Sequence, residues 1–273
     1  MRDDELASGP RGPVRHVRDR AEVTKQTRRM LCTIVGAGPG LGIALAGRFL
    51  RGGYDVALVS RSPGRLERWR QAQVQPERIG LFSADAGSPE SLARAFDATR
   101  SWRGETSVLI YNAAAMAPNQ IASLDSALIA ETMRVDVGGA LSCIQEVLPS
   151  MRREGRGTIL LTGGGLALEP YPEWGSLAAG KAALRSVGLG LFKELLPAGI
   201  HVAVVAVCGI VEPGGLFDPD LVAEQYWHLH TQPLDQAQRE FVYLPEGADP
   251  YYNDPQARHR GTSQPIRAVG VGL

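Results

Sequence analysis

Short apolar runs alternate with longer segments of helical period along most of the chain. The apolar runs predict strands, and they are LCTIV, DVALVS, RIGLFSA, SVLIYNA, GTILLT and GIHVAVVAV. The segments between them repeat apolar residues three or four positions apart, which predicts helices such as SPESLARAFDATR and SLAAGKAALRSVGLGLFKELL. Since strands that alternate with helices form βαβ crossovers, we expect an α/β fold with a doubly wound parallel sheet covered on both faces.

The alternation does not extend over the whole chain. Residues 1–29 mix arginines with acidic residues and prolines and show no sustained apolar period, so we expect a disordered leader there. Residues 30–246 form one predicted domain, in which the segment 209–245 loses the rhythm and is expected to act as a substrate lid. Residues 247–273 predict an irregular tail.

Composition and charge exclude several classes of function. Basic and acidic residues number 29 each, so the chain has no electrostatic footprint for nucleic acid or an anionic membrane. No apolar run approaches the roughly 20 residues that a membrane-spanning helix needs, and the start of the chain has no hydrophobic signal core. Cys32, Cys143 and Cys208 lie far apart, which argues against disulfides and zinc. We expect a cytoplasmic protein with a small-molecule partner and no metal.

A glycine-rich turn follows the first predicted strand and opens a helix. Its sequence is GAGPGLG, and the residues expected to bind a cofactor are Gly36, Gly38, Gly40, Leu41 and Gly42. Glycines let the backbone approach a pyrophosphate closely, and the first turn of the helix presents free N–H groups to its charge. Strand, turn and helix together predict a Rossmann-type dinucleotide-binding domain.

The end of the second predicted strand selects between two dinucleotides. Sites for NAD tend to place an aspartate or glutamate there, where it binds the ribose hydroxyls. Here the strand ends in Ser60 and Arg61, and an arginine neutralises a 2′-phosphate. We therefore expect both residues to contact the cofactor, which is NADP rather than NAD.

The spacing Gly36-x3-Gly40-x-Gly42 resembles the glycine motif of the short-chain dehydrogenase/reductase family, and the resemblance covers roughly residues 31 to 211. The resemblance implies further cofactor contacts at matching positions. Asp85 would hold the adenine amino group, Asn112 and Ala113 of YNAA would lie beside the adenosine, Lys181 of GKAALRS would bind the nicotinamide ribose, and the backbone of Val211 would meet the carboxamide. Family members usually associate through two long helices, here around 125–150 and 176–197, which implies a homo-oligomer, a dimer or a tetramer.

The resemblance fails at positions that carry the family's chemistry. Its mechanism needs a tyrosine four residues before the lysine, a serine that orients the substrate carbonyl, and a helix asparagine that helps to hold a water. Here these positions are Leu177, Gly164 and Asp136, and a tyrosine further upstream is also lacking, because Trp174 stands there. Leucine and glycine side chains cannot transfer a proton, so the usual ketone reductase mechanism does not carry over.

Three interpretations stay open. The first is an oxidoreductase with a reassigned site, in which Lys181 binds the cofactor and Tyr171, Tyr226, His228 or His230 supplies the proton. The second is a catalytically silent NADP-binding sensor, and the third is a non-catalytic subunit of a mixed oligomer. Hydride transfer to an activated double bond or an iminium ion needs no strong protein acid. The missing acid therefore does not by itself distinguish the first interpretation from the second.

Several side chains could supply or shape this reassigned site. Asp136 could act as an acid if burial raises its pKa, although we favour a salt bridge to Lys181. Tyr171 lies in LEPYPEWGS, a loop expected to run over the nicotinamide. There it is either the proton donor or an aromatic side chain that packs within the loop, and both interpretations stay open. In the predicted lid, Phe217, Tyr226 and Trp227 are expected to close an apolar pocket over the nicotinamide. Of the two histidines in YWHLH, at most one points inward, because residues two apart on a helix do not share a face.

Overall fold

The computed structural model describes residues 30–249, and the predicted leader and most of the predicted tail lie outside them. Within the described residues, seven strands form one parallel sheet in the order β3-β2-β1-β4-β5-β6-β7. The strands are β1 (Leu31–Val35), β2 (Asp55–Ser60), β3 (Ile79–Ser83), β4 (Thr106–Tyr111), β5 (Gly157–Thr162), β6 (Ile200–Val207) and β7 (Glu240–Tyr243). The chain changes direction across the sheet between β3 and β4, so the carboxyl ends of β1 and β4 lie side by side, where ligands bind in open α/β sheets.

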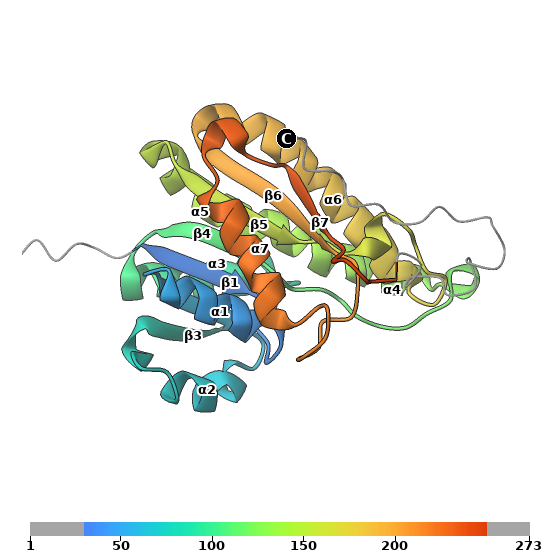
Figure 1. Ribbon diagram of the computed structural model, residues 1–273, viewed down its shortest axis with the longest axis horizontal. Helices are drawn as coiled ribbons and strands as arrows, with labels where there is room; N and C mark the ends of the chain where they lie inside the picture. The colour runs from blue at the N-terminus through green and yellow to red at the C-terminus, as the bar shows by residue number, and fades with distance from the viewer. Residues whose placement is uncertain (1–29, 250–273) are drawn as a thin grey trace, which may run out of the picture.

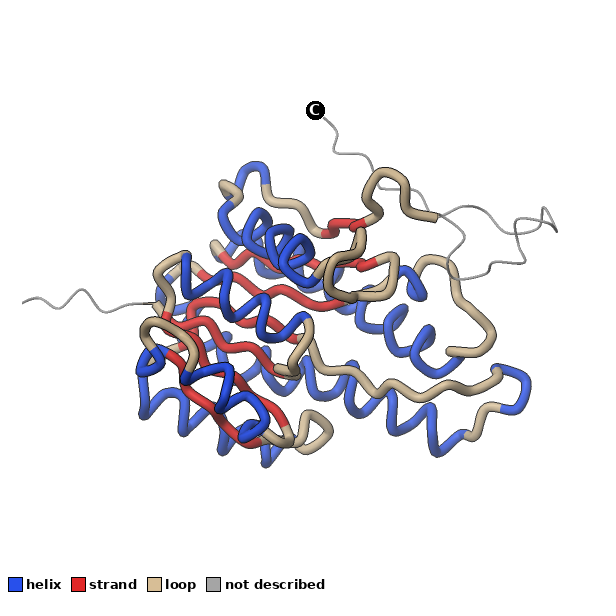
Figure 2. Tube along the Cα trace, turned by 60° about the horizontal axis from the view of Figure 1, so that its bottom comes forward, coloured by secondary structure: helices blue, strands red, loops and turns tan. Residues whose placement is uncertain are grey.

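Helices cover both faces of this sheet (Figures 1 and 2). They are α1 (Leu41–Arg51), α2 (Glu67–Gln71), α3 (Pro89–Arg103), α4 (Ser126–Met133), α5 (Gly139–Glu154), α6 (Gly175–Leu195) and α7 (Pro219–Thr231), with a π-helix over Arg134–Gly138 between α4 and α5. The doubly wound α/β fold expected from the sequence is thus confirmed, and the six expected strands are all present. The oligomer implied by the two long helical regions stays a prediction.

The pleat of the strands divides most of their side chains between two large hydrophobic clusters, and a small third cluster contains Ala206, Cys208 and Val242 at β6 and β7. In β1, Ile34 packs into the cluster under α1 and α7, whereas Val35 packs into the cluster under α3, α5 and α6. Leu58 and Val59 of β2 divide in the same way. Successive side chains of a strand point to opposite faces, so a strand covered on both faces must be apolar throughout. This explains why the strands read as continuous apolar runs in the sequence.

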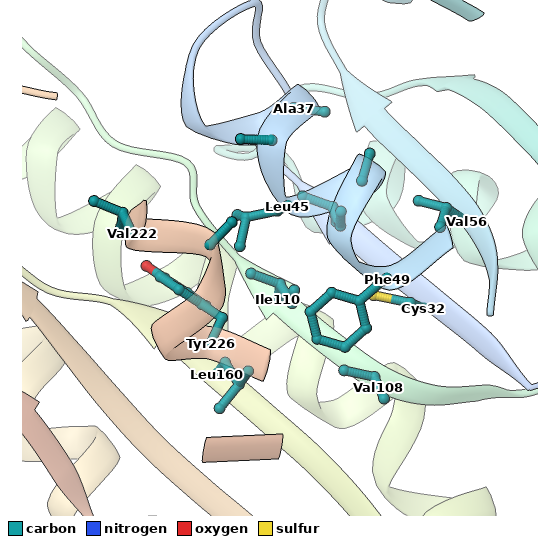
Figure 3. Close-up of a cluster of buried hydrophobic side chains, with 14 of the residues drawn as sticks. Cys32, Ala37, Leu45, Phe49, Val56, Val108, Ile110, Leu160, Val222 and Tyr226 are labelled. Carbon is teal, nitrogen blue, oxygen red and sulfur yellow. The ribbon is translucent and has the colours of Figure 1, made fainter. Parts of the chain in front are cut away.

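Helix α7 packs on α1, on the outer side of the first cluster (Figure 3). Tyr226 is fully buried there, and the ring of Trp227 meets the ring of Phe49 edge to face with centroids 5.3 Å apart. The guanidinium of Arg48 lies over the same indole at 4.1 Å from its centroid. Tyr226 and Trp227 therefore belong to the core, which corrects the expectation that they cover the nicotinamide.

The segment expected to be a lid contains two regular elements. Between residues 209 and 245, α7 covers α1 and β7 extends the sheet beyond β6. The residues that form a loop at the carboxyl end of the sheet are 208–218, which connect β6 to α7. None of the described helices is long and apolar enough to cross a membrane.

Candidate functional site

The turn after β1 can be built only with glycine at two of its positions. Gly36 has a φ of +82°, and a Cβ on it would lie 2.3 Å from the backbone nitrogen of Ala113. A Cβ on Gly42 would lie 2.8 Å from the Cα of Ala37. Both contacts are shorter than any real side chain tolerates, so these two glycines hold the loop against β4 and the helix against the loop.

The other two glycines of the turn face open space. A Cβ on Gly38 or on Gly40 would meet nothing within 4 Å. Helix α1 begins at Leu41, directly after Gly40, and no side chain caps its amino end. The N–H groups of Leu41 and Gly42 are available to an anion, whereas that of Ile43 donates to the carbonyl of Gly38, and the helix dipole favours negative charge there.

A cavity of about 600 Å³ opens at the carboxyl ends of β1 to β4. It brings together six of the predicted cofactor residues: Gly36, Ser60, Arg61, Asp85, Asn112 and Ala113. The other six, Gly38, Gly40, Leu41, Gly42, Lys181 and Val211, do not line it; Gly40 lines a separate cavity between α1 and the residues before α7, and Val211 packs partly buried against the first hydrophobic cluster. The cavity thus occupies the half of the site in which the sequence predicts the adenosine.

Two polar residues of this cavity also hold the surrounding backbone. The amide of Asn112 donates to the carbonyl of Gly36 at 3.0 Å, which ties the end of β4 to the glycine turn. A carboxylate oxygen of Asp85 accepts from the backbone N–H of Gly87 at 2.9 Å and shapes its own loop. Arg61 is exposed at the rim, and its guanidinium makes no hydrogen bond or salt bridge within residues 30–249.

These residues fit a dinucleotide. The close approach at Gly36 and the open faces of Gly38 and Gly40 leave room for a pyrophosphate beside an uncapped helix. The cavity has the volume of a typical small-molecule site, with a free cation at its rim in Arg61. The groups needed to hold an adenosine pyrophosphate are therefore present on this chain.

Lys181 lies deep at the other end of the site. It is 6% exposed, and its ammonium donates to the carbonyl of Thr162, the last residue of β5, at 2.8 Å. Burial lowers the pKa of this amine, and the negative charge of Asp136 opposes that change. The lysine is thus held by backbone on the helix that follows β5, where the resemblance places it.

Asp136 lies in the π-helix and is fully buried. One carboxylate oxygen accepts from the backbone N–H of Ala115 at 2.8 Å, and the other oxygen has no hydrogen-bond partner in the described part of the protein. Burial raises the pKa of this carboxyl, while the ammonium of Lys181 opposes the rise. π-helical turns are frequent at functional sites, and an unpaired buried carboxyl oxygen is the position that a proton or a water would occupy.

The salt bridge expected between Asp136 and Lys181 is wrong. Within residues 30–249 the two groups interact through space without direct contact, because each is held by a backbone partner. The second oxygen of Asp136 lies 3.0 Å from where a Cβ on Gly180 would be, so the carboxyl is packed against the helix one residue before the lysine. A larger residue at position 180 would displace it.

The positions of the family's tyrosine and serine carry no proton donor. Leu177 is 6% exposed on α6, and Gly164 lies in extended backbone at the start of the loop after β5. Tyr171 is half-buried in the same loop, but it does not line the cavity, and none of its described contacts joins its hydroxyl to Lys181 or Asp136. The hydroxyl of Tyr226 is 2.7 Å from Oγ1 of Thr162.

The two histidines of α7 point in different directions, as the helical spacing predicts. His228 is exposed, whereas the ring of His230 lies between the hydroxyl of Tyr54 at 2.7 Å and Oγ1 of Thr158 at 3.0 Å. These contacts bind α7 to the amino ends of β2 and β5, at the edge of the sheet opposite the cavity. The described residues contain no group of three side chains that could hold a metal ion.

One polar link in this region was not predicted. The side chain of Asn119, in the loop after β4, accepts from the backbone N–H of Ser176 at 3.0 Å and donates to its Oγ at 2.7 Å. It thereby caps the amino end of α6, whose own N-cap residue, Trp174, forms no capping bond. The loops after β4 and β5 are joined at this point, since Asn119 also pairs with Trp174 in a parallel bridge.

Comparison with known proteins agrees with this geometry. A family model described as short chain dehydrogenase matches residues 31–216. Human 17-beta-hydroxysteroid dehydrogenase type 1 is 30% identical over 192 residues, which cover 67% of this chain and 57% of that protein. The match thus spans little more than half of that relative's length.

Solved structures of the same fold are similar over most of the chain. An alcohol dehydrogenase from Thermococcus sibiricus complexed with 5-hydroxy-NADP has a TM-score of 0.71 at 23% identity and covers 80% of this chain and 99% of that one. A 3-ketoacyl-(acyl-carrier-protein) reductase from Brucella melitensis complexed with NADH has a TM-score of 0.71 at 24% identity, with coverages of 78% and 95%. At these identities the likeness shows the fold alone. Because the family model matches more than half of its residues, the chain belongs to the short chain dehydrogenase family.

Proposed function

We propose that this protein is an NADP(H)-dependent oxidoreductase with a reassigned catalytic site, acting on a small organic substrate. The observation that carries the choice of cofactor is the cavity at the ends of β1 to β4, at whose rim Arg61 has no protein partner within residues 30–249. A free guanidinium at the end of β2 matches a 2′-phosphate in charge and in hydrogen-bonding geometry. Ser60 beside it carries no negative charge that would repel this phosphate.

Each residue has a role that follows from its position. The turn at Gly36 to Gly42 and the amino end of α1 bind the pyrophosphate, and Arg61 binds the 2′-phosphate. Lys181, fixed by the carbonyl of Thr162, positions the nicotinamide ribose. When bound, the cofactor supplies or accepts a hydride. The residues at positions 164 and 177 shape this end of the site and move no proton.

Asp136 is the candidate acid of this site for a substrate that needs a proton. Burial raises the pKa of its carboxyl, which favours the neutral form that can donate a proton, while the ammonium of Lys181 opposes that rise. The unpaired oxygen of Asp136 gives such a proton a place to reside. Tyr171 is the alternative donor, and a Tyr171→Phe variant that keeps full activity would exclude it.

The decisive test is a thermal-unfolding scan with NADPH, with NADH and without nucleotide. A ligand at about 100 times its dissociation constant adds about 2.7 kcal/mol to the stability of the folded state. We expect NADPH to stabilise the protein more than NADH, and Arg61→Ala to remove the preference. Arg94→Ala is the matched control, because Arg94 is an exposed arginine of α3 outside the cavity. Equal responses to the two nucleotides would refute the NADP assignment.

A catalytically silent NADP-binding protein is the second candidate, and one observation favours it. No side chain at positions 164 and 177 can donate a proton, so a substrate carbonyl would meet no acid where the family provides one. If this candidate is right, NADPH stabilises the folded protein, but no class of substrate, charged or neutral, causes NADPH to be oxidised. Turnover with any defined substrate, lost in Lys181→Met, would exclude it.

A further inference from the structure

We propose that the substrate of this site is an apolar organic cation, an iminium ion that is reduced to an amine. The proposal rests on the proposed function, because it assigns a substrate class to the same site. Charge, surface character and the missing acid group each support it.

The first support is the charge of the loops around the substrate end of the site. These loops follow β4, β5, β6 and β7 and occupy residues 112–125, 163–174, 208–218 and 244–249. Since the strands are parallel, all four loops lie at the carboxyl edge of the sheet, and Figure 1 shows those after β4 and β5 on one side beside α4. They contain no lysine, arginine or histidine, and their acidic residues are Asp125, Glu169, Glu173, Glu212, Asp218, Glu246 and Asp249.

This charge distribution is not a consequence of composition. The whole chain has 29 basic and 29 acidic residues, so the negative charge of the loops is a local segregation. Asp125 and Asp218 cap helices through their carboxylates, and the backbone N–H groups of Gly214 and Asp220 lower the pKa of Asp218. Lys181, on the helix after β5, is buried against Thr162, and Arg61 lies at the end of β2, where the 2′-phosphate of the cofactor is proposed to bind. Loops of this charge attract cations and repel anions.

The second support is the apolar surface of the same loops. Four of the large hydrophobic side chains that the structure leaves exposed lie there: Met116 is 71% exposed, Ile121 51%, Ile210 76% and Leu216 47%. Met116 also lines the cavity at the ends of β1 to β4. A rim that combines exposed apolar side chains with carboxylates matches a ligand with an apolar body and a positive charge.

The third support is the chemistry of the inner site. A ketone that receives a hydride becomes an alkoxide, which needs a proton from a nearby acid. Leu177 and Gly164 provide no such acid at the positions where the family has its tyrosine and serine. An iminium ion avoids the need for a proton altogether.

The reaction balances without any protein acid. A hydride from the reduced nicotinamide forms a C–H bond at the iminium carbon, and the π electrons of the C=N bond become a lone pair on nitrogen. The iminium is reduced to a neutral tertiary amine, and the nicotinamide dinucleotide is oxidised. The positive charge passes from the substrate to the nicotinamide ring, and no proton is taken up or released in this step.

The test compares a permanent cation with a neutral ligand of the same shape. N-methyl-dihydroisoquinolinium is the iminium probe and tetralone is the neutral ketone control, each added to the full chain with NADP present. Binding is measured by the ligand-dependent shift in thermal unfolding and by titration calorimetry, and turnover is followed by the loss of NADPH absorbance. The variants are Glu173→Gln and Glu212→Gln, alone and together, with Glu77→Gln as control. Glu77 is exposed and lies before β3, at the amino edge of the sheet, and its substitution removes the same charge as each loop variant.

We expect the protein to bind and reduce the iminium and not the ketone. Removal of both loop carboxylates should weaken cation binding about three- to tenfold at low salt, and the effect should shrink at about 0.5 M salt. Glu77→Gln should bind as the unchanged protein does. Reduction of the ketone in preference to the iminium, or equal weakening by the loop and control variants, would overturn the substrate assignment. Failure of NADPH to stabilise the protein would instead overturn the proposed function on which the assignment rests.

Discussion

The partly buried histidine of α7, His230, gives a quantitative prediction about stability at acid pH. The ring of His230 is held between the hydroxyl of Tyr54 and Oγ1 of Thr158, and burial lowers its pKa from 6.5 to about 4. At pH above 6.5 the ring is neutral in both the folded and the unfolded chain, so it has no effect on the pH dependence of stability. Below 6.5 the unfolded chain takes up a proton that the folded chain does not bind until about pH 4, and stability falls as pH falls.

The size of the effect follows from the same two pKa values. Each unit of difference is worth about 1.4 kcal/mol, so the full loss between pH 6.5 and pH 4 is about 3 kcal/mol, and about 2 kcal/mol of it is present at pH 5. His201, whose pKa burial also lowers, changes stability in the same direction. The comparison must therefore isolate the contribution of His230 by substitution.

Urea unfolding at pH 8, 7, 6 and 5 measures this contribution. His230→Gln should be less stable than the unchanged protein at pH 8, because it loses the fit between Tyr54 and Thr158, and this difference should shrink by about 2 kcal/mol at pH 5. His228→Gln is the matched control, because it changes an exposed imidazole on the same helix. A difference between unchanged protein and His230→Gln that stays constant from pH 8 to pH 5 would refute the assignment.

Three further predictions concern the turn, the core and a buried ion pair. Gly36→Ala should lower the free energy of unfolding by more than about 2 kcal/mol and abolish stabilisation by NADPH, because its Cβ would clash with backbone. Gly40→Ala should fold normally, and thermal scans distinguish the two variants. Tyr226→Phe should cost about 1 kcal/mol in urea unfolding, from loss of the bond to Thr162, and no cost would mean that this bond is not formed in solution. Arg78→Met should lower the free energy of unfolding by about 3 kcal/mol in urea unfolding, because it removes a partner of the buried carboxylate of Asp55, and an unchanged stability would contradict this role of the ion pair.

Elements with a strong local pattern were predictable from the sequence. The six predicted strands are apolar throughout because both faces are covered, and this leaves a signal that requires no knowledge of the tertiary structure. The glycine turn was predictable for a similar reason, since the short contact at Gly36 permits no other residue. β7 has only four residues, Glu240–Tyr243, and its polar surroundings gave no such signal.

Long-range partners were not predictable. Trp227 packs on α1, where a Cβ on Gly52 would collide with its indole. Neither segment has a local sequence pattern that predicts this contact with the other. The salt bridge expected between Asp136 and Lys181 does not form, because Asp136 accepts from the backbone N–H of Ala115 in the loop after β4 and Lys181 donates to the carbonyl of Thr162 at the end of β5. The cap that Asn119 provides to α6 comes from a different loop, so the search for a local capping residue could not find it.

The part of the site around Lys181 and Asp136 lowers the stability of the fold and lacks the proton donors that the family uses. A buried lysine and a buried carboxyl that share no direct contact destabilise a folded protein relative to well-packed apolar side chains. Under the proposed function a ligand offsets this cost at Lys181, since a ribose hydroxyl would supply a hydrogen-bond acceptor beside the carbonyl of Thr162. Leu177 and Gly164 remove the family's acid but not the lysine, so cofactor binding and proton donation are separate in the proposed function, and a substrate that needs no proton is the chemistry that such a separation permits.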